Sequence, residues 1–258
     1  MEQVLKMNRD IKMEDFIKAA HSNDLEKTQA TLCVFSPEQI AGPYFRNDRL
    51  ERYDITEGAD GVPMELVLNV VNFNTCEPVE GLLVDIWHCN AQGLYSGWSE
   101  VDPDQEAPSG EIGSIPRTDE DSYLRGCGFT NEYGNCSFLS VFPGFYAGRS
   151  VHIHVTVRKL YEQHNDRHVA YVGQLYVPEL ISAQINELPG YAGRKIARLR
   201  NEQDEIYSEM HGSGTLLNID WVNRGTAQER LLGTVVIGVD PDAFSTYITP
   251  EDFDKDTV

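Results

Sequence analysis

The sequence predicts a mainly β protein: a single antiparallel β-sandwich domain with a helical N-terminal extension and a short late helix. Three observations predict this class. From residue 64 onward, short β-branched runs alternate between apolar and polar residues, which is the period of a half-buried strand. Turn sequences containing glycine or proline separate these runs. The chain has 258 residues, with no internal repeat and no low-complexity linker, so one large domain accounts for it.

The first 35 residues are expected to be helical. Apolar residues recur there at roughly helical intervals, at Ile11, Phe16, Ile17, Ala20 and Leu25. The stretch "FSPEQIAGPYFRND" follows, and its prolines and glycine mark a loop that enters the main domain. We therefore expect an extension over residues 1–35 and a β-sandwich domain over residues 36–258.

Seven strands are expected in the main domain, and turn residues bound each of them. They cover residues 64–73, 82–89, 136–142, 151–160, 170–177, 214–222 and 231–239. A short late helix is predicted within 194–210, where apolar residues stand near helical spacing. The acidic stretch 99–122 contains proline and glycine and is expected to be a flexible loop.

Charge and hydropathy narrow the class of partner. Twenty-one basic and 41 acidic residues give a net charge of −20, which argues against nucleic acid or an anionic membrane surface as partner. No run of about 18 apolar residues predicts a transmembrane helix. The charged N-terminus lacks the apolar region of a secretory signal. These features predict an intracellular, cytoplasmic protein.

The five cysteines are expected to be free thiols. Their number is odd and they include no CxxC pair, which makes a zinc knuckle a poor fit. Cys127 and Cys136 flank "GFTNEYGN", a predicted hairpin tip, and could face each other across two strands. A bridge between them is not expected without an oxidising compartment.

His152 and His154 are the first candidate functional residues. They stand at i and i+2 in a predicted strand, so both imidazoles project from one face, while Val151, Ile153 and Val155 occupy the other. Such a pair can converge on one metal ion, or it can be incidental on a solvent-facing strand. The surrounding residues match neither a cupin nor a zinc hydrolase. The histidines alone therefore leave the metal open, and no phosphate loop, dinucleotide fingerprint or serine-hydrolase elbow is present.

Longer motifs are more specific. "PVEGLLVDIWHCNAQGLYSGW", followed by "YLRGCGFTNEYGNCSFLSVFPGFYAGRSVHIHV", resembles the intradiol ring-cleavage dioxygenases, the family of protocatechuate and catechol dioxygenases. The upstream "SPEQIAGPYFRNDRLERYDI" is similar to the entry segment of that family. The resemblance runs from about residue 36 to about residue 180, with weaker similarity to about residue 240. Residues 1–35 lie outside its strongest part.

The resemblance implies a non-haem Fe(III) site. Matched motif by motif, the ligands would be Tyr95 in "GLYSGW", Tyr146 in "PGFYAGR", and His152 and His154 in "HIH". The residue types fit this metal, because phenolates are hard anionic oxygens that stabilise the ferric state and imidazole suits iron. Two phenolates and a hydroxide would balance three positive charges. Tyr95 alone would be interpreted as an ordinary core or surface aromatic.

The resemblance also implies an intradiol dioxygenase that inserts both atoms of O₂ into a catechol-type aromatic. The ring would open between the two hydroxylated carbons to give a muconate-type diacid. Tyr146 would accept a substrate proton, and Arg149 would stabilise negative charge developing on the ring. Gln174 and Tyr44 would line the substrate pocket. Two alternatives stay open: the same ferric site in a different oxidative ring cleavage of a biosynthetic pathway, and a non-catalytic β-sandwich binding module.

Two further expectations concern the substrate and the assembly. The acidic loop 99–122 is expected near the pocket mouth, where it would disfavour a small anionic acid such as protocatechuate and favour a neutral or larger catechol. Relatives often pair through N-terminal helices, so residues 1–35 are the candidate contact of a homodimer.

Overall fold

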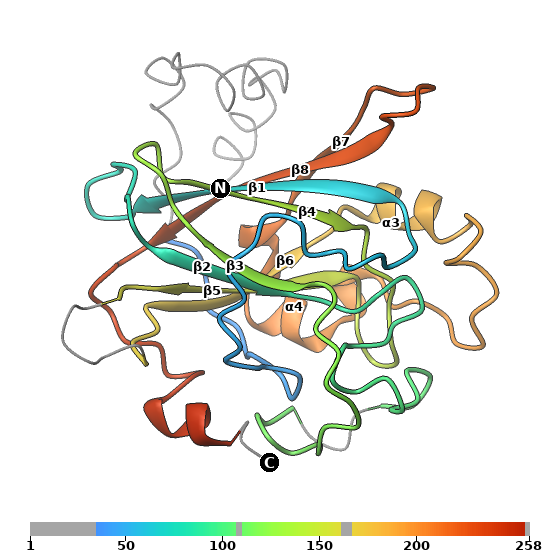
Figure 1. The fold of residues 1–258 in the computed structure, drawn as a ribbon, viewed down its shortest axis with the longest axis horizontal. Coiled ribbons are helices and arrows are strands. Elements are labelled where there is room, and N and C mark those ends of the chain that lie inside the picture. The colour runs from blue at the N-terminus through green and yellow to red at the C-terminus, as the bar shows by residue number, and fades with distance from the viewer. Residues whose placement is uncertain (1–34, 107–109, 161–166, 256–258) are drawn as a thin grey trace.

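Two β-sheets packed face to face form the body of the protein (Figure 1). The computed structural model describes residues 35–106, 110–160 and 167–255. The first sheet has the strand order β4-β1-β8-β7 and the second the order β3-β2-β5-β6. The predicted mainly β sandwich is therefore confirmed. Residues 1–34 of the expected helical extension, and with them the expected dimer contact, lie outside the described residues.

All seven expected strands are present, most of them shortened at the ends. The first sheet contains β1 (Pro63–Asn72), β4 (Asn135–Val141), β7 (Asn218–Val222) and β8 (Arg230–Val239). The second contains β2 (Leu83–Trp87), β3 (Arg125–Phe129), β5 (His152–Arg158) and β6 (Tyr171–Tyr176). Side chains from both sheets interdigitate in one core, which explains why these short runs alternate so regularly.

The sandwich is not purely antiparallel. Strand β8 runs parallel to β1, in the middle of the first sheet, while the other neighbours in both sheets are antiparallel. Parallel neighbours require a long connection, and here the chain builds the whole second sheet between β1 and β8. Alternation within a strand does not encode the direction of its neighbours, so the sequence could not show this.

The expected hairpin around residues 130–134 is also corrected. Strand β3 pairs with β2, whereas β4 pairs with β1, so the turn between β3 and β4 crosses from one sheet to the other. Cys127 and Cys136 are free, as expected, and both are buried. Cys76, however, is disulfide-bonded, so the expectation of five free thiols is wrong. Because disulfides are typical of oxidising compartments, the disulfide at Cys76 does not support the prediction of an intracellular protein.

The late helix is shorter than predicted. Residues 194–200 are irregular, and the segment contains only the 3₁₀ turn η2 (Asn201–Gln203) and helix α4 (Glu205–Glu209). Ile196 packs against the core, so its apolar character serves packing and not a helix. Helix α3 (Glu179–Ile185) was not predicted. The other 3₁₀ turns among the described residues are η3 (Gly212–Thr215) and η4 (Pro250–Asp254). Within the described ranges, none of the helices has the length and hydropathy needed to cross a membrane.

Strand β5 is buried on both of its faces. Ile153 and Val155 point into the core between the sheets. The alternate residues, including His152 and His154, lie on the outer face of the second sheet, under a layer of loops that contributes Tyr44, Phe45, Tyr95 and Trp98 to a second apolar cluster. The segment that follows residue 35 and the chain around η4 both lie on this side of the second sheet (Figure 1). A solvent-facing histidine pair is therefore excluded.

Candidate metal centre and its arginine

The strand register places five side chains on one patch of the second sheet. His154 on β5 lies directly opposite Trp87 on β2 and Gln174 on β6, and His152 lies opposite Tyr176. Residues opposite each other in adjacent strands share a face. The indole of Trp87 stacks on the ring of His154, with the centroids 4.9 Å apart and the planes 4° from parallel. This contact fixes the orientation of the imidazole.

Tyr95 and Tyr146 reach the same patch from two turns. The Asn90 carboxamide oxygen accepts hydrogen bonds from the backbone N–H groups of Gln92 and Leu94, at 2.9 and 3.0 Å, and so folds the turn before Tyr95. The irregular segment before Tyr146 is packed against this turn. A side chain at Gly93, where φ is +86°, would start 2.2 Å from the carbonyl oxygen of Phe145. Only glycine allows this approach, which brings the two tyrosines together.

Three donor atoms converge. The Tyr146 hydroxyl lies 3.1 Å from His152 Nε2, which lies 3.2 Å from His154 Nε2. The Tyr95 ring stands beside them, with centroids 5.6 Å from Tyr146 and 6.3 Å from His154. Two donors that bind one transition-metal ion at right angles, about 2.1 Å from it, stand about 3 Å apart. The observed spacing has this value.

The hydrogen-bond partners leave the ring nitrogens ready for a cation. His152 Nδ1 lies 2.7 Å from the carbonyl oxygen of Ser150, which can only accept, so Nδ1 carries the proton and the Nε2 lone pair faces the cluster. The buried Tyr95 hydroxyl has no hydrogen-bond partner among the described residues. An unpartnered buried hydroxyl is costly unless something binds it. The four side chains therefore fit a ferric ion.

Binding of a metal ion at this cluster would require Tyr95 and Tyr146. Within the described residues, histidine, cysteine and carboxylate side chains alone form no group of three that could hold a metal ion. Burial raises the pKa of both Tyr95 and Tyr146, and the neighbouring phenol of Tyr146 adds to the effect at Tyr95. Without a cation both phenols therefore stay protonated near neutral pH. A bound trication would reverse this and release their protons.

Burial also lowers the pKa of His152 and His154 well below its ordinary value. Arg149 adds to this at His152, and the neighbouring imidazole of His152 adds to it at His154. Both imidazoles are consequently neutral at neutral pH, which is the form that binds metals. Tyr146 is partly exposed, whereas Tyr95 is only 2% exposed. Access from solvent is therefore on the Tyr146 side.

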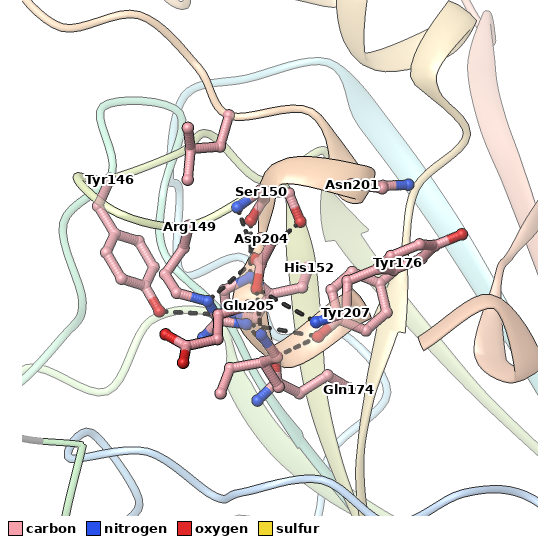
Figure 2. Close-up of polar contacts among 12 residues, drawn as sticks. Tyr146, Arg149, Ser150, His152, Gln174, Tyr176, Asn201, Asp204, Glu205 and Tyr207 are labelled. Atoms are coloured by element: carbon pink, nitrogen blue, oxygen red, sulfur yellow. Dashed lines mark hydrogen bonds and ion pairs between the residues drawn. The ribbon is translucent and has the colours of Figure 1, made fainter. Parts of the chain in front are cut away.

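Arg149 lies beside the cluster and is held by several partners (Figure 2). Its Nε donates to the Asp204 carboxylate at 3.0 Å, and one terminal nitrogen donates to Gln174 and, at 3.4 Å, to the hydroxyl of Tyr176. Gln174 also donates to the carbonyl oxygen of Ile40 at 2.8 Å. Gln174, expected in the substrate pocket, thus lies against the arginine and ties it to the entry segment.

Tyr44, the other expected pocket residue, packs on the candidate ligands. Its ring stacks on that of Tyr95 at 4.3 Å and meets Tyr146 edge-on at 6.2 Å. The buried guanidinium of Arg125 fixes both segments, because it donates to the carbonyl oxygen of Tyr44 at 2.8 Å and to the Ser96 hydroxyl and carbonyl oxygens, each at 2.9 Å. The sequence did not identify Arg125 as a residue of this site.

Asp204 and Tyr176 were also missed. Tyr176 stands two residues after Gln174 in a predicted strand, so the i, i+2 rule would have put it on the same face. Asp204 precedes a short helix and accepts hydrogen bonds from the backbone N–H groups of Ile206 and Tyr207, a capping signal that sequence shows. Nothing in the sequence places its other oxygen on Arg149.

The fold and the site define a class: a β-sandwich protein with a buried cluster of two tyrosines and two histidines and an adjacent arginine. A solved intradiol ring-cleavage dioxygenase from Tetranychus urticae is 31% identical to this chain, with a TM-score of 0.72. The alignment covers 83% of this chain and 98% of that one. The chain therefore belongs to the intradiol ring-cleavage dioxygenase family.

Two bacterial structures are more distant. One is the dioxygenase domain of a dioxygenase–carbohydrate-binding fusion from Streptomyces sp. SirexAA-E, at 25% identity and a TM-score of 0.51, covering 80% of this chain and 99% of that chain. The other is 3-chlorocatechol 1,2-dioxygenase from Rhodococcus opacus 1CP, at 17% identity and a TM-score of 0.52, covering 79% and 72%; it shows the fold alone. No family model matches the sequence. No curated protein matches it either.

Proposed function

We propose that the protein is a non-haem Fe(III) intradiol dioxygenase in which Tyr95, Tyr146, His152 and His154 bind the metal. The observation that carries the proposal is the convergence of the Tyr146 hydroxyl and the two Nε2 atoms, at 3.1 and 3.2 Å, beside the unpartnered hydroxyl of Tyr95. The substrate is a catechol-type aromatic and the second substrate is O₂. Similarity to the intradiol dioxygenase from Tetranychus urticae supports this class of reaction.

The reaction balances without another cofactor. A catechol and one O₂ contain all the atoms of a muconate-type diacid, with both oxygen atoms retained and the bond between the hydroxylated carbons broken. No external reductant is consumed. Bound iron would supply Lewis acidity that makes the coordinated aromatic ring reactive toward O₂.

Tyr146 is the residue we assign to proton transfer. It is the one of the four proposed ligands that is partly exposed, so an incoming catechol meets it first. Its oxygen would accept the proton of a catechol hydroxyl when the substrate binds. Burial raises the pKa of the Tyr146 phenol, which favours the protonated form that results from this transfer.

Arg149 is the residue we assign to stabilising charge. Interaction with the Tyr146 phenol and with Asp204 raises the pKa of its guanidinium, against the opposing effect of burial, so it remains a cation. A fixed cation beside the metal centre stabilises negative charge that develops on the ring and on the incoming oxygen. Gln174, which contacts Arg149, and Tyr44, which stacks on Tyr95, are the residues we assign to the wall of the substrate pocket.

Colour, metal content and product test the proposal together. Protein supplied with iron should show a tyrosinate-to-iron absorption band in the visible region, consume one O₂ per catechol and form a product of the mass of the diacid. Tyr95→Phe should lose bound iron and the band. Tyr53→Phe is the matched control, because Tyr53 is 52% exposed on the surface and should change neither. A wild-type protein that stays colourless and inactive with added iron would contradict the proposal.

A further inference from the structure

A single carboxylate organises the arginine side of the candidate site. Asp204 is 0% exposed, and its two oxygens accept five hydrogen bonds. Oδ2 accepts from Arg149 Nε at 3.0 Å and from the N–H and hydroxyl of Ser150 at 2.8 and 2.9 Å. Oδ1 accepts from the N–H groups of Ile206 and Tyr207 at 2.9 and 3.2 Å. A buried charge satisfied in this way is rigid.

These contacts determine which part of Arg149 is available to a substrate. Asp204 occupies Nε, while Gln174 and Tyr176 occupy Nη2 (Figure 2). Nη1 donates to no acceptor among the described residues, and the side chain is 15% exposed. The planar guanidinium is thus held by two of its three nitrogens, and the third is left for a reacting group.

The Asp204 carboxylate is also linked, through Ser150, to His152, one of the proposed metal ligands. Asp204 holds both the N–H and the hydroxyl of Ser150, whose carbonyl oxygen accepts the Nδ1 proton of His152 at 2.7 Å. That last bond keeps the proton off Nε2 of His152. One buried side chain therefore supports the orientation of Arg149 and the tautomer of a proposed ligand.

We propose that Asp204 is a positioning residue of the dioxygenase reaction, which acts through Arg149 and Ser150 without touching the substrate. The inference rests on the proposed function for its kinetic part. Its structural part, that Asp204 immobilises the Arg149 guanidinium, holds for the metal-free protein and can be measured there.

The first test is a nuclear magnetic resonance measurement on iron-free, ¹⁵N-labelled protein. The Nε–H resonance of Arg149, assigned by its loss in Arg149→Lys, should exchange slowly with water in the wild type. In Asp204→Asn, which keeps the shape but removes the charge, exchange should be at least about tenfold faster. Glu202→Gln removes one carboxylate from an exposed site nearby and should leave the exchange rate unchanged.

The second test is kinetic, on the iron-loaded protein. Asp204→Asn should lower kcat about 10- to 100-fold and change KM less, because the aligned cation acts on developing charge. Iron content and the visible band should persist. In an Arg149→Lys background, adding Asp204→Asn should lower kcat by a further factor of less than about three, since the two residues act as one unit.

The outcomes separate the two proposals. Unchanged Nε–H exchange in Asp204→Asn, or losses that multiply in the double variant, would overturn the role of Asp204. If the wild type cleaves no catechol, the proposed function fails, and the exchange measurement decides by itself whether Asp204 holds Arg149. Should Asp204→Asn not fold, Asp204→Glu keeps the charge but displaces it by one methylene. In Asp204→Glu the Arg149 Nε–H should exchange faster than in the wild type, and kcat should fall by a smaller factor than is expected for Asp204→Asn. Wild-type values of both quantities would overturn the inference.

Discussion

The rings of Tyr44 and Tyr95 stack with their centroids 4.3 Å apart and their planes 19° from parallel. Tyr44 comes from the segment that enters the domain, and Tyr95 from the turn after β2. The contact places an expected pocket residue directly on a proposed iron ligand. Tyr44 thereby supports the orientation of the Tyr95 phenol.

Removing the Tyr44 ring should therefore weaken the metal site. Tyr44→Leu should lower iron affinity and kcat/KM by about three- to tenfold, the value of one aromatic pair. Tyr44→Phe retains the ring and should stay within about twofold of the wild type. Metal analysis and the visible band of the two variants provide the measurement. Equal losses in both would show that the hydroxyl matters and the stacking does not.

Arg125 should hold the two segments that carry Tyr44 and Tyr95. Its side chain is buried and donates three hydrogen bonds, to the Tyr44 carbonyl and to two oxygens of Ser96. Lysine cannot supply this fork of donors, so Arg125→Lys should reduce the free energy of unfolding by about 2–4 kcal/mol. Urea titration of the iron-free protein measures this change.

The control is the same change at an exposed position. Arg224 lies on the surface against Trp221, and Arg224→Lys should alter the free energy of unfolding by less than about 0.5 kcal/mol. Arg125→Lys should also reduce bound iron, because the turn that carries Tyr95 loses its anchor. Full iron occupancy together with wild-type stability would contradict the assignment.

The acidic loop should select against anionic substrates. Its described part reaches the Tyr146 turn, where the Ala147 N–H donates to the Pro103 carbonyl at 2.8 Å. The Glu106 carboxylate lies against Gly148, where an added Cβ would be 3.5 Å from its Oε1. Glu106→Gln should raise kcat/KM for protocatechuate about two- to fivefold at low salt and leave catechol unchanged.

Glu132→Gln provides the comparison, because Glu132 is exposed in the turn between β3 and β4 and away from the candidate site. It should not change the ratio of the two substrates. The effect of Glu106→Gln should also disappear in high salt, since the carboxylate is exposed and its field is screened. A wild-type protein that prefers protocatechuate to catechol would contradict the prediction.

His88 should make the iron-free protein less stable in mild acid. Its ring is fully buried between the Cys89 carbonyl at 2.8 Å and the Ser140 hydroxyl at 2.7 Å, and burial lowers its pKa from 6.5 to about 4. The unfolded chain takes up this proton below pH 6.5, whereas the folded protein takes it up only near pH 4. The contribution of His88 to the free energy of unfolding is therefore fully present above pH 6.5 and is lost as the pH drops toward 4.

Between pH 7 and pH 5 this residue should account for a loss of about 2 kcal/mol in the free energy of unfolding. His88→Gln cannot titrate, so its own loss over that interval should be smaller by this amount, even though the variant starts from lower stability. Urea titrations at the two pH values give the comparison. Identical pH slopes for the variant and the wild type would refute the assignment.

Local patterns predicted much of the fold. Period-two alternation located the strands because each has one face in the core between the sheets, as Ile153 and Val155 do. The same period placed His152 and His154 together on the other face. Helical spacing failed around Ile196, where apolar residues pack on the core from irregular chain, since burial alone does not require a helix.

The sequence by itself determined the two-layer β architecture, the pair of histidines on one face, and, through its longer motifs, the resemblance that joined Tyr95, Tyr146 and Arg149 to them. Only the tertiary structure decided that β8 runs parallel to β1, that the acidic loop reaches the Tyr146 turn, and that Asp204, Gln174 and Tyr176 converge on Arg149. The physical reason is the separation along the chain between the residues that interact. Alternation and turn residues are encoded by near neighbours along the chain, whereas a buried arginine finds its partners among segments that meet only after the sheets have packed.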